Sequence, residues 1–164
     1  IDKAQVRRRL PDVVEIHLTE REPVARWKAA GLVDANGNIF QAATTETFPE
    51  FDGQPGTAKT MVAHYQEFSG LLKPAGLSIA KLEYTPRSAW SVVLDNGITV
   101  RLGREHENAR LQQFAAVWPG ILRAQQSGLA YVDMRYKDGF AVRERAPGEM
   151  PSETAASAAD HNQQ

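Results

Sequence analysis

The chain has 164 residues and no cysteine, and its 19 basic and 20 acidic residues give a formal charge of −1. This balance excludes the strong basic excess of nucleic-acid-binding domains, and the lack of cysteine excludes disulfides, thiolate metal ligands and cysteine nucleophiles. An apolar fraction of 42% is near the globular average and suffices for a packed core. We therefore expect one full domain with additional segments and no nucleic-acid partner.

No run of about 18 apolar residues occurs, so the sequence predicts no segment that spans a bilayer. The chain begins at Ile1, inside a charged and strand-like stretch without a starting methionine. No signal peptide is visible. We therefore expect a fragment whose targeting information lies upstream.

The N-terminal residues carry the pattern of a β-hairpin. Val14, Ile16 and Leu18 alternate with polar residues over residues 13–20, as in a strand with one buried face. A Pro-Asp turn separates this stretch from residues 3–9. Because two strands alone are marginally stable in water, we expect further elements to complete this unit.

A second β region follows over residues 24–40. Its Asn36-Gly37 pair predicts a tight hairpin turn, because both central positions of such a turn favour φ above zero. Residues 41–56 contain two prolines and two glycines, which predicts a loop.

Residues 57–73 change to a helical period. Thr57 is the expected N-cap, and Pro74 and Gly76 are expected to end the helix. The apolar residues that form one stripe along this helix are Met61, Tyr65, Phe68 and Leu72.

A strand over residues 78–85 and a hairpin over residues 89–103, closed by Asn96-Gly97, are predicted next. A second helix is predicted over residues 105–125, with Ser127-Gly128 as its stop signal.

The closing unit is predicted as two strands around the turn Lys137-Asp138-Gly139, and the last strand covers residues 139–144. From Ala146 onward the chain has no aromatic and no β-branched aliphatic residue. Such a segment buries too little apolar area to offset an ordering cost of about 1–2 kcal/mol per residue. We therefore predict a disordered tail over residues 146–164.

Two short motifs have a chemical and a structural interpretation. Glu105-His106-Glu107 is the most site-like cluster, but a metalloprotease helix needs a second histidine four positions after the first, and position 110 is Arg110. Acidic residues in a first helical turn are explained by the helix dipole. The stretch 53–57 before the first helix lacks the Gly-Lys-Ser/Thr ending of a phosphate loop, so an ordinary loop with an N-cap is favoured.

The remaining polar residues form no catalytic constellation. The four histidines are scattered without the spacing of a zinc site, and no serine has the context of a nucleophile. Asp133 and Arg135 share a strand face and are expected to form a solvated pair that contributes about 0–1 kcal/mol. We therefore expect no enzymatic activity, no cofactor and no metal.

Five motifs stand in a fixed order along residues 4–145. They are PDVVEIHLTEREPVARW (11–27), LVDANGNIF (32–40), AWSVVLDNGITVRLGR (89–104), RLQQFAAVWPGI (110–121) and YVDMRYKDGFAV (131–142). In this order and spacing they closely resemble the periplasmic part of the FtsQ/DivIB family of bacterial cell division proteins. Each motif alone is modest, and the specificity comes from the five together.

The resemblance implies an α+β fold. Residues 1–22 correspond to the last two strands of a POTRA module, and residues 23–145 to a β domain with a large antiparallel sheet and two helices packed on it. Family members carry a short cytoplasmic tail, one transmembrane helix and a complete POTRA module before the β domain. The resemblance thus implies that the anchor and the first part of POTRA are absent here.

The resemblance also implies a function. The family acts as a non-catalytic scaffold at the division septum, as the periplasmic domain of a single-pass inner-membrane protein that links early and late divisome proteins. Its implied partners are FtsB and FtsL, together with other divisome proteins. FtsB adds a strand to the last strand of the β domain, a mode in which main-chain hydrogen bonds supply attraction and side-chain pockets supply specificity.

Arg135 is expected from the resemblance to pair with a partner carboxylate, and Tyr136 to serve as a rigid anchor. Arg87 corresponds to a further contact arginine. Some members carry a Trp shortly after the last strand, where this chain has Arg143-Glu144-Arg145, so Phe140 is an alternative anchor. The full set at the implied contact is Arg135, Tyr136, Asp138, Gly139, Phe140, Ala141, Val142 and Arg87.

Alternatives remain open at this point. Tyr136 also suits a buried cross-strand position, whereas Trp27, Trp90 and Trp118 are expected in the core, because large aromatic residues mostly supply buried area. A POTRA-type envelope chaperone or assembly module is a rival function that predicts further POTRA repeats. An envelope hydrolase is a second rival, and it predicts a convergent polar cleft.

Overall fold

The computed structural model describes residues 3–9 and 13–150. Its strands are β1 (Lys3–Arg9), β2 (Val13–Thr19), β3 (Pro23–Trp27), β4 (Gly31–Asp34), β5 (Ile39–Phe40), β6 (Glu50–Asp52), β7 (Ile79–Tyr84), β8 (Trp90–Leu94), β9 (Thr99–Gly103), β10 (Leu129–Asp133) and β11 (Ala141–Glu144). Its α-helices are α1 (Ala58–Leu72) and α2 (Glu107–Val117).

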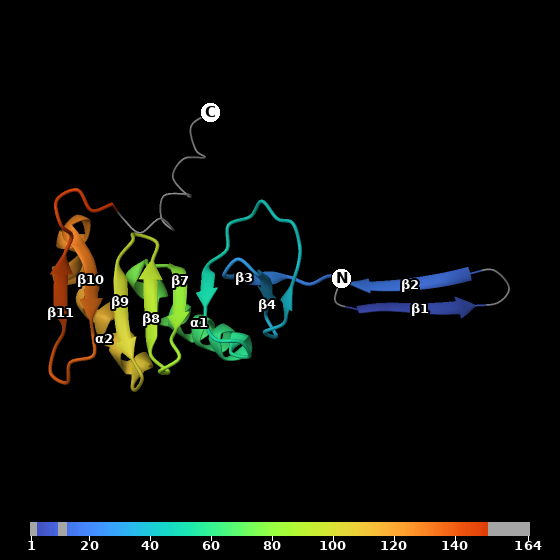
Figure 1. Cartoon of the computed structure of the whole chain (residues 1–164), viewed down its shortest axis with the longest axis horizontal. Coiled ribbons are helices and arrows are strands. Elements are labelled where there is room, and N and C mark those ends of the chain that lie inside the picture. Colours follow the sequence, from blue (N-terminus) through green and yellow to red (C-terminus); the bar gives the residue numbers. More distant parts are fainter. Residues whose placement is uncertain (1–2, 10–12, 151–164) are drawn as a thin grey trace, which may run out of the picture.

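One sheet contains nine strands in the order β11-β10-β9-β8-β7-β6-β3-β4-β5, and β1 pairs with β2 in a separate hairpin. The two α-helices lie on the same face of the large sheet, and the hairpin extends away from the side that holds β3 and β4 (Figure 1). The expected α+β architecture with one large sheet and two helices is therefore present.

The sheet is mixed, which corrects the expectation of an antiparallel sheet. The pairs β3–β6, β6–β7 and β9–β10 are parallel. Two of these pairs follow from the helices, since α1 connects β6 to β7 and α2 lies in the connection from β9 to β10. A helical connection returns the chain to the end where the previous strand began, so the next strand runs in the same direction.

The central strand β6 was not predicted. The sequence pattern indicated a loop over residues 41–56, yet Glu50–Asp52 pairs with β3 on one side and β7 on the other. Three residues directly after Pro49 are too short to show an alternation, and only Phe51 is fully buried. The strand is specified by its two neighbours rather than by its own sequence.

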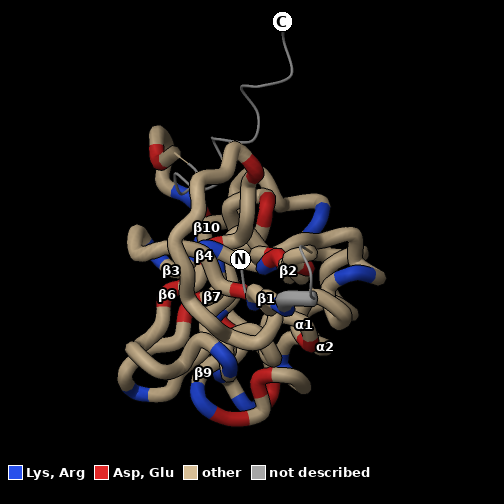
Figure 2. The backbone as a smooth tube through the Cα atoms, turned by 90° about the vertical axis from the view of Figure 1, so that its right-hand side faces the viewer, with Lys and Arg blue, Asp and Glu red and all other residues tan. Residues whose placement is uncertain are grey.

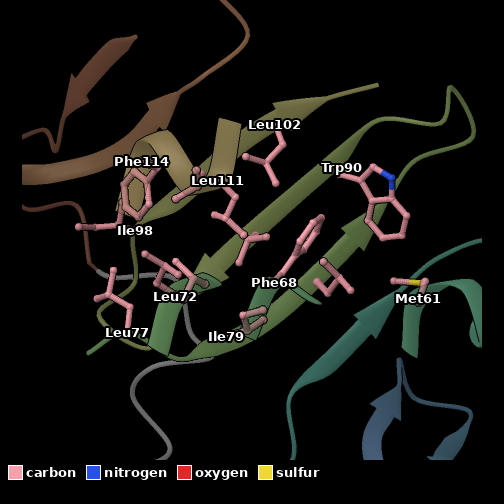
Figure 3. Close-up of a cluster of buried hydrophobic side chains, with 14 of the residues drawn as sticks. Met61, Phe68, Leu72, Leu77, Ile79, Trp90, Ile98, Leu102, Leu111 and Phe114 are labelled. Atoms are coloured by element: carbon pink, nitrogen blue, oxygen red, sulfur yellow. The ribbon is translucent and has the colours of Figure 1, made fainter. Parts of the chain in front are cut away.

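The hydrophobic core lies between the sheet and the two helices. Phe68 and Leu72 of α1 and Leu111 and Phe114 of α2 are fully buried and point toward the strands, which contribute Leu102 and others (Figure 3). The apolar stripe predicted for the first helix faces the sheet in this way.

The three tryptophans are buried, as predicted. Trp27, Trp90 and Trp118 are 7%, 4% and 3% exposed. Trp90 stacks between Tyr84 and the imidazole of His64, each with a ring separation of 4.2 Å. These residues supply buried area, and none of them lies free at the surface.

The first helix begins where the sequence predicted it, after Thr57. The Thr57 hydroxyl donates to the Gln54 carbonyl and makes no capping hydrogen bond to the helix. A 3₁₀ turn over Lys73–Ala75 follows α1, and Gly76 ends it with φ of 71°.

The second α-helix is shorter than the predicted 105–125. Pro119 lacks an N–H donor and its ring disfavours continuation of an α-helix. The chain proceeds instead through a π turn over Trp118–Leu122 and a 3₁₀ turn over Arg123–Gly128. Leu111, Phe114, Trp118 and Leu122 are buried along this segment, but Ile121, which a continuous α-helix would place on the same face, is 63% exposed.

The predicted N-terminal hairpin is present as β1 and β2, and its turn at residues 10–12 lies outside the described residues. Val6, Ile16 and Leu18 are 65%, 60% and 59% exposed. The expected buried face is thus uncovered by any part of the chain that the structure describes. The POTRA assignment of residues 1–22 stays a prediction.

The first residues of the predicted disordered tail form a turn. Backbone N–H of Glu149 donates to the Ala146 carbonyl, and N–H of Ala146 donates to the Glu149 carboxylate. Residues 151–164, which make up the rest of that predicted segment, lie outside the described residues.

Candidate protein-binding edge

The strand β11 forms one end of the nine-stranded sheet and pairs with β10 in antiparallel fashion. It covers Ala141–Glu144, so it is shorter than the predicted 139–144, and Gly139 and Phe140 belong to the connection before it. Within the described residues nothing pairs with its outer side. The last strand is therefore an open edge.

The backbone of β11 presents alternate residues to that open side. Arg145 donates its backbone N–H to the Gly128 carbonyl, at the side of β10. The main-chain groups of successive residues in a strand point in opposite directions. Those of Val142 and Glu144 consequently face outward, where an added strand would find them.

Arg135 follows β10 and is held by the buried carboxylate of Asp133. Its Nε lies 2.8 Å from Oδ1, its Nη2 lies 2.6 Å from Oδ2, and its backbone N–H donates to Oδ1 at 3.1 Å. Asp133 is only 5% exposed. The expectation of a solvated pair is wrong for this carboxylate, because Asp133 is buried. The two hydrogen bonds to its oxygens also fix the guanidinium of Arg135 in one orientation.

The electrostatics agree with this geometry. The hydrogen bonds from the Arg135 side chain lower the pKa of Asp133, against the opposing effect of burial. The same hydrogen bonds raise the pKa of Arg135 above its ordinary value. Both groups remain charged near neutral pH, and the arginine is positioned before any partner arrives.

A basic pocket of about 490 Å³ lies beside Arg135. Three connections between elements form its walls, together with the helix α2. Its lining residues are Arg87, Ala89, Gly103, Arg104, Glu105, Arg110 and Arg135. Four arginines against one glutamate give it a net positive charge, so a carboxylate is the chemistry that suits it. Figure 2 shows the neighbouring basic and acidic segments of the backbone below β9.

Two arginine side chains of this pocket lie close to the backbone at Gly103. Gly103 has φ of 80°, and a Cβ there would lie 2.9 Å from Nη1 of Arg110 and 3.2 Å from Cγ of Arg135. The Arg110 guanidinium donates to the Leu102 carbonyl. Arg104 and Arg110 were not predicted as site residues, because they come together only through the β9–α2 connection.

Tyr136 is 60% exposed, which excludes its alternative as a core aromatic. Phe140 is half-buried and packs against the hydrophobic core, so it is less available than Tyr136 as an anchor. Asp138 lies in the turn before Gly139, between these two aromatics. The structure thus brings Arg87 and Arg135 to one pocket, and Tyr136 directly follows Arg135 in the chain.

A second group of basic residues lies on the sheet face opposite the helices. The guanidinium carbons of Arg101 and Arg143 are 4.2 Å and 5.9 Å from the centre of the Tyr131 ring. The Glu149 carboxylate lies 3.7 Å from Nη2 of Arg143. The period-2 pattern places these residues on one face, but their proximity depends on the strand register.

Within the cluster Glu105-His106-Glu107, Glu107 contacts the other helix, whereas Glu105 lines the basic pocket. Glu107 lies in the first turn of α2, and its Oε1 is 3.4 Å from Nε2 of His64 on α1. The pair ties the two helices together. The described residues include no group of three potential metal-ligating side chains, counting His, Cys, Asp and Glu.

Comparison with known proteins identifies the family. The family model "Cell division protein FtsQ/DivIB, C-terminal" matches residues 25–135, from β3 to the arginine after β10. The chain belongs to the FtsQ/DivIB family of cell division proteins. The match covers the sheet from β3 to β10 and both helices, and it ends directly before Tyr136, so β11 lies outside it.

Relatives named cell division protein FtsQ extend the similarity. The chain is 54% identical over 152 residues to the one from Neisseria gonorrhoeae, which covers 92% of this chain and 62% of the relative. It is 54% identical over 149 residues to that of Neisseria meningitidis serogroup B, with coverages of 90% and 63%. For Xanthomonas campestris pv. campestris the values are 36% over 148 residues, with coverages of 88% and 53%.

The chain thus spans between 53% and 63% of the length of these three relatives. Among the helices of the described residues, none has the length and hydropathy needed to cross a bilayer. These matches show the family.

Proposed function

We propose that this chain is a non-catalytic scaffold of the division machinery that binds FtsB, together with FtsL, by strand addition at β11. The observation that carries the proposal is the open edge of the large sheet. Its outward donors and acceptors match an extended peptide, which gains main-chain hydrogen bonds when it aligns with the edge. Membership of the FtsQ/DivIB family supports a role in division.

The basic pocket supports the same site. Arg135 follows β10, and Arg87 lies between β7 and β8 at the same end of the sheet, so that both line one pocket that fits a carboxylate of the partner. Because Asp133 already fixes the orientation of Arg135, binding costs little further side-chain ordering. A single partner segment that runs along β11 and continues into the pocket would use both features.

Tyr136 supplies an exposed aromatic next to this path. Rigid aromatic side chains offer a large contact area at a small entropic cost, and they are enriched among residues that dominate binding energy. We assign Tyr136 as the anchor, Asp138, Gly139 and Phe140 as the connection that positions the edge, and Ala141 and Val142 as part of the edge strand itself. In the whole protein we place this domain in the periplasm, at the septum, behind a single N-terminal membrane helix.

The test is a titration of a synthetic peptide from the periplasmic segment of FtsB, followed by fluorescence anisotropy. Tyr136→Ala is expected to weaken binding by about 2 kcal/mol, which is roughly 30-fold. Ile121→Ala is the matched control, because Ile121 is 63% exposed and lies in the turn after α2, far along the chain from β11.

Circular dichroism and thermal unfolding of each variant separate a binding effect from a folding effect. Tyr136 is exposed, so the variant is expected to unfold at the temperature of the wild type. Equal affinity of the wild type and Tyr136→Ala, with both folded, contradicts the assignment of the anchor. Absence of FtsB binding to the folded wild type contradicts the proposed function itself.

A further inference from the structure

The two faces of β11 differ in chemistry. Val142 pairs with Val132 of β10, whereas Arg143 pairs with Tyr131. Successive side chains of a strand point to opposite faces. Val142 therefore lies on the face that carries the helices, and Arg143 lies on the uncovered face.

On the helix side, Val142 ends an apolar row that crosses six strands. The row is defined by direct register partners, each from the next strand of the sheet: Phe51, Leu82, Val92, Val100, Val132 and Val142. The first five are fully buried, and Val142 is 45% exposed. An apolar residue on an added strand would extend this row and cover Val142.

On the uncovered face, Arg143 ends a different row. Thr99 pairs with Tyr131, and Tyr131 pairs with Arg143. Arg101 also lies over the Tyr131 ring, so two guanidinium groups flank one aromatic side chain. The outer end of this row therefore carries positive charge at the open edge.

The chain itself supplies a carboxylate to this position. Glu149 reaches back from the turn after β11, and its Oε2 lies 3.7 Å from Nη2 of Arg143. Both side chains are largely exposed, at 41% and 55%, so the pair is weak and exchangeable. Glu149 shows which kind of group Arg143 accepts when no partner strand is present.

We propose that β11 selects a partner strand by a two-sided pattern, with an acidic residue beside Arg143 on the uncovered face and an apolar residue beside Val142 on the helix side, and that Glu149 occupies the place of the partner carboxylate until binding displaces it. The inference rests on strand addition as the proposed function. It adds the chemistry of the partner strand and an internal competitor for it.

Cross-strand pairing gives the expected size of the effect. Opposite charges directly across a strand pair stabilise by about 0.2–1 kcal/mol, and like charges destabilise. Replacement of an acidic by a basic residue beside Arg143 is therefore expected to weaken binding by roughly 2- to 30-fold. The charge contribution is expected to shrink at high salt, because both groups are exposed.

The probe is the FtsB peptide of the titration above, in which each strand position is replaced in turn by Glu and by Lys. On the wild type, one position is expected to favour Glu over Lys by roughly 2- to 30-fold. On Arg143→Glu, the same position is expected to favour Lys. Glu149→Gln is expected to raise the affinity of the acidic peptide by about twofold, because the competing carboxylate is gone.

Arg26→Glu is the matched control. Arg26 is exposed on β3 and belongs to the same face, since register partners connect it through Glu50 and Lys81 toward Arg143. This variant is expected to change net charge equally and to leave the preference for Glu unchanged.

The outcomes separate the two proposals. If the peptide binds but no position reverses its preference on Arg143→Glu, the charge pattern is wrong and strand addition stands. If Glu149→Gln leaves the affinity of the acidic peptide unchanged, the role of Glu149 as a competitor is wrong. If no peptide binds the folded wild type, both the pattern and the proposed function fail.

Discussion

The two edges of the nine-stranded sheet are built differently. The edge strand β11 has four residues, and its outward side is unpaired within the described chain. The opposite edge strand β5 has two residues, Ile39–Phe40, and the side chain of Gln41 donates to the Ala30 carbonyl beside it. A short strand gives an incoming chain few hydrogen bonds, so of these two edges β11 offers the longer template for an added strand.

Near each edge of the sheet lies one buried aspartate, and the two carboxylates accept hydrogen bonds from different kinds of donors. Asp34, 5% exposed, accepts from the backbone N–H groups of Asn36 and Asn38 and from the Asn38 side chain. It stabilises the β4–β5 turn internally. Asp133, equally buried, holds the guanidinium of Arg135 toward the basic pocket. A buried carboxylate thus stabilises a turn near one edge and orients an accessible guanidinium near the other.

The largest predicted difference between the edges is in their tolerance of proline. Val142→Pro removes an outward N–H and introduces a ring at the side where a partner strand would align. FtsB binding is expected to weaken by about 2–3 kcal/mol, roughly 30- to 150-fold, since an acceptor of the partner is left unpaired. Calorimetric titration measures this loss.

Ile39→Pro is the matched substitution at β5. Asn38 accepts from the Asp34 N–H, so the backbone groups of Ile39 also face outward. The affinity of Ile39→Pro for FtsB is expected to equal that of the wild type. An equal loss for both proline variants contradicts the assignment of β11 as the binding edge.

The next effect concerns the two aspartates. Arg135→Ala and Asn38→Ala each remove a side-chain donor from a buried carboxylate, and each is expected to lower the free energy of unfolding by about 1–2 kcal/mol. Only Arg135→Ala is expected to weaken FtsB binding, by about tenfold, through loss of a charge-assisted hydrogen bond. Urea unfolding and peptide titration of both variants check this; equal binding would remove Arg135 from the site.

A smaller effect on the stability of the fold is expected when the pH is lowered. Burial opposes ionisation of Asp34, but hydrogen bonds from Asn38 and Asn36 and the charge of Arg21 outweigh it and lower its pKa. The pKa of Asp133 is lowered by the hydrogen bonds from Arg135 despite burial. Both groups therefore stabilise the fold above the pKa of an unfolded aspartate, about 3.9, and this stabilisation disappears as the pH falls through their folded-state pKa values.

Urea unfolding between pH 7 and pH 3 measures this loss. Asp133→Asn and Asp34→Asn are each expected to flatten the decrease, because the unfolded state then binds no additional proton at that position. A decrease of unchanged slope in the double variant would show that other carboxylates account for the acid sensitivity.

The smallest predicted effect is that of Arg87. This arginine is exposed at the rim of the basic pocket, so Arg87→Ala is expected to weaken FtsB binding by only about two- to fivefold. The difference is expected to vanish in 1 M salt, where the Debye length is about 3 Å. A loss that persists at high salt would indicate that Arg87 contacts the partner by packing.

Local patterns predicted most of the elements. The Asn36-Gly37 and Asn96-Gly97 turns and the stripe of the first helix each depend on neighbours in sequence, and all are present. The strand β6 and the parallel pairs were missed, because both depend on strands distant in the chain.

The residues of the candidate site also divide into those that the sequence predicted and those that only the fold brings together. Arg135 and Tyr136 were predicted through the family resemblance, and the structure adds that Tyr136 is exposed and that Asp133 fixes Arg135. Arg104 and Arg110 carry no local signal, since only the fold of the β9–α2 connection brings them to the pocket.

The parallel pairing of β9 with β10 has a consequence for folding order. Residues 104–128 separate these strands, and they include α2 and the two turns that follow it. Contacts that close such a long segment form late, because loop closure must precede them. The strand β11 joins the large sheet only through β10, so the β10–β11 hairpin becomes its edge only after that closure. A partner that recognises β11 as the edge of the large sheet therefore recognises a chain in which β9 and β10 are already paired.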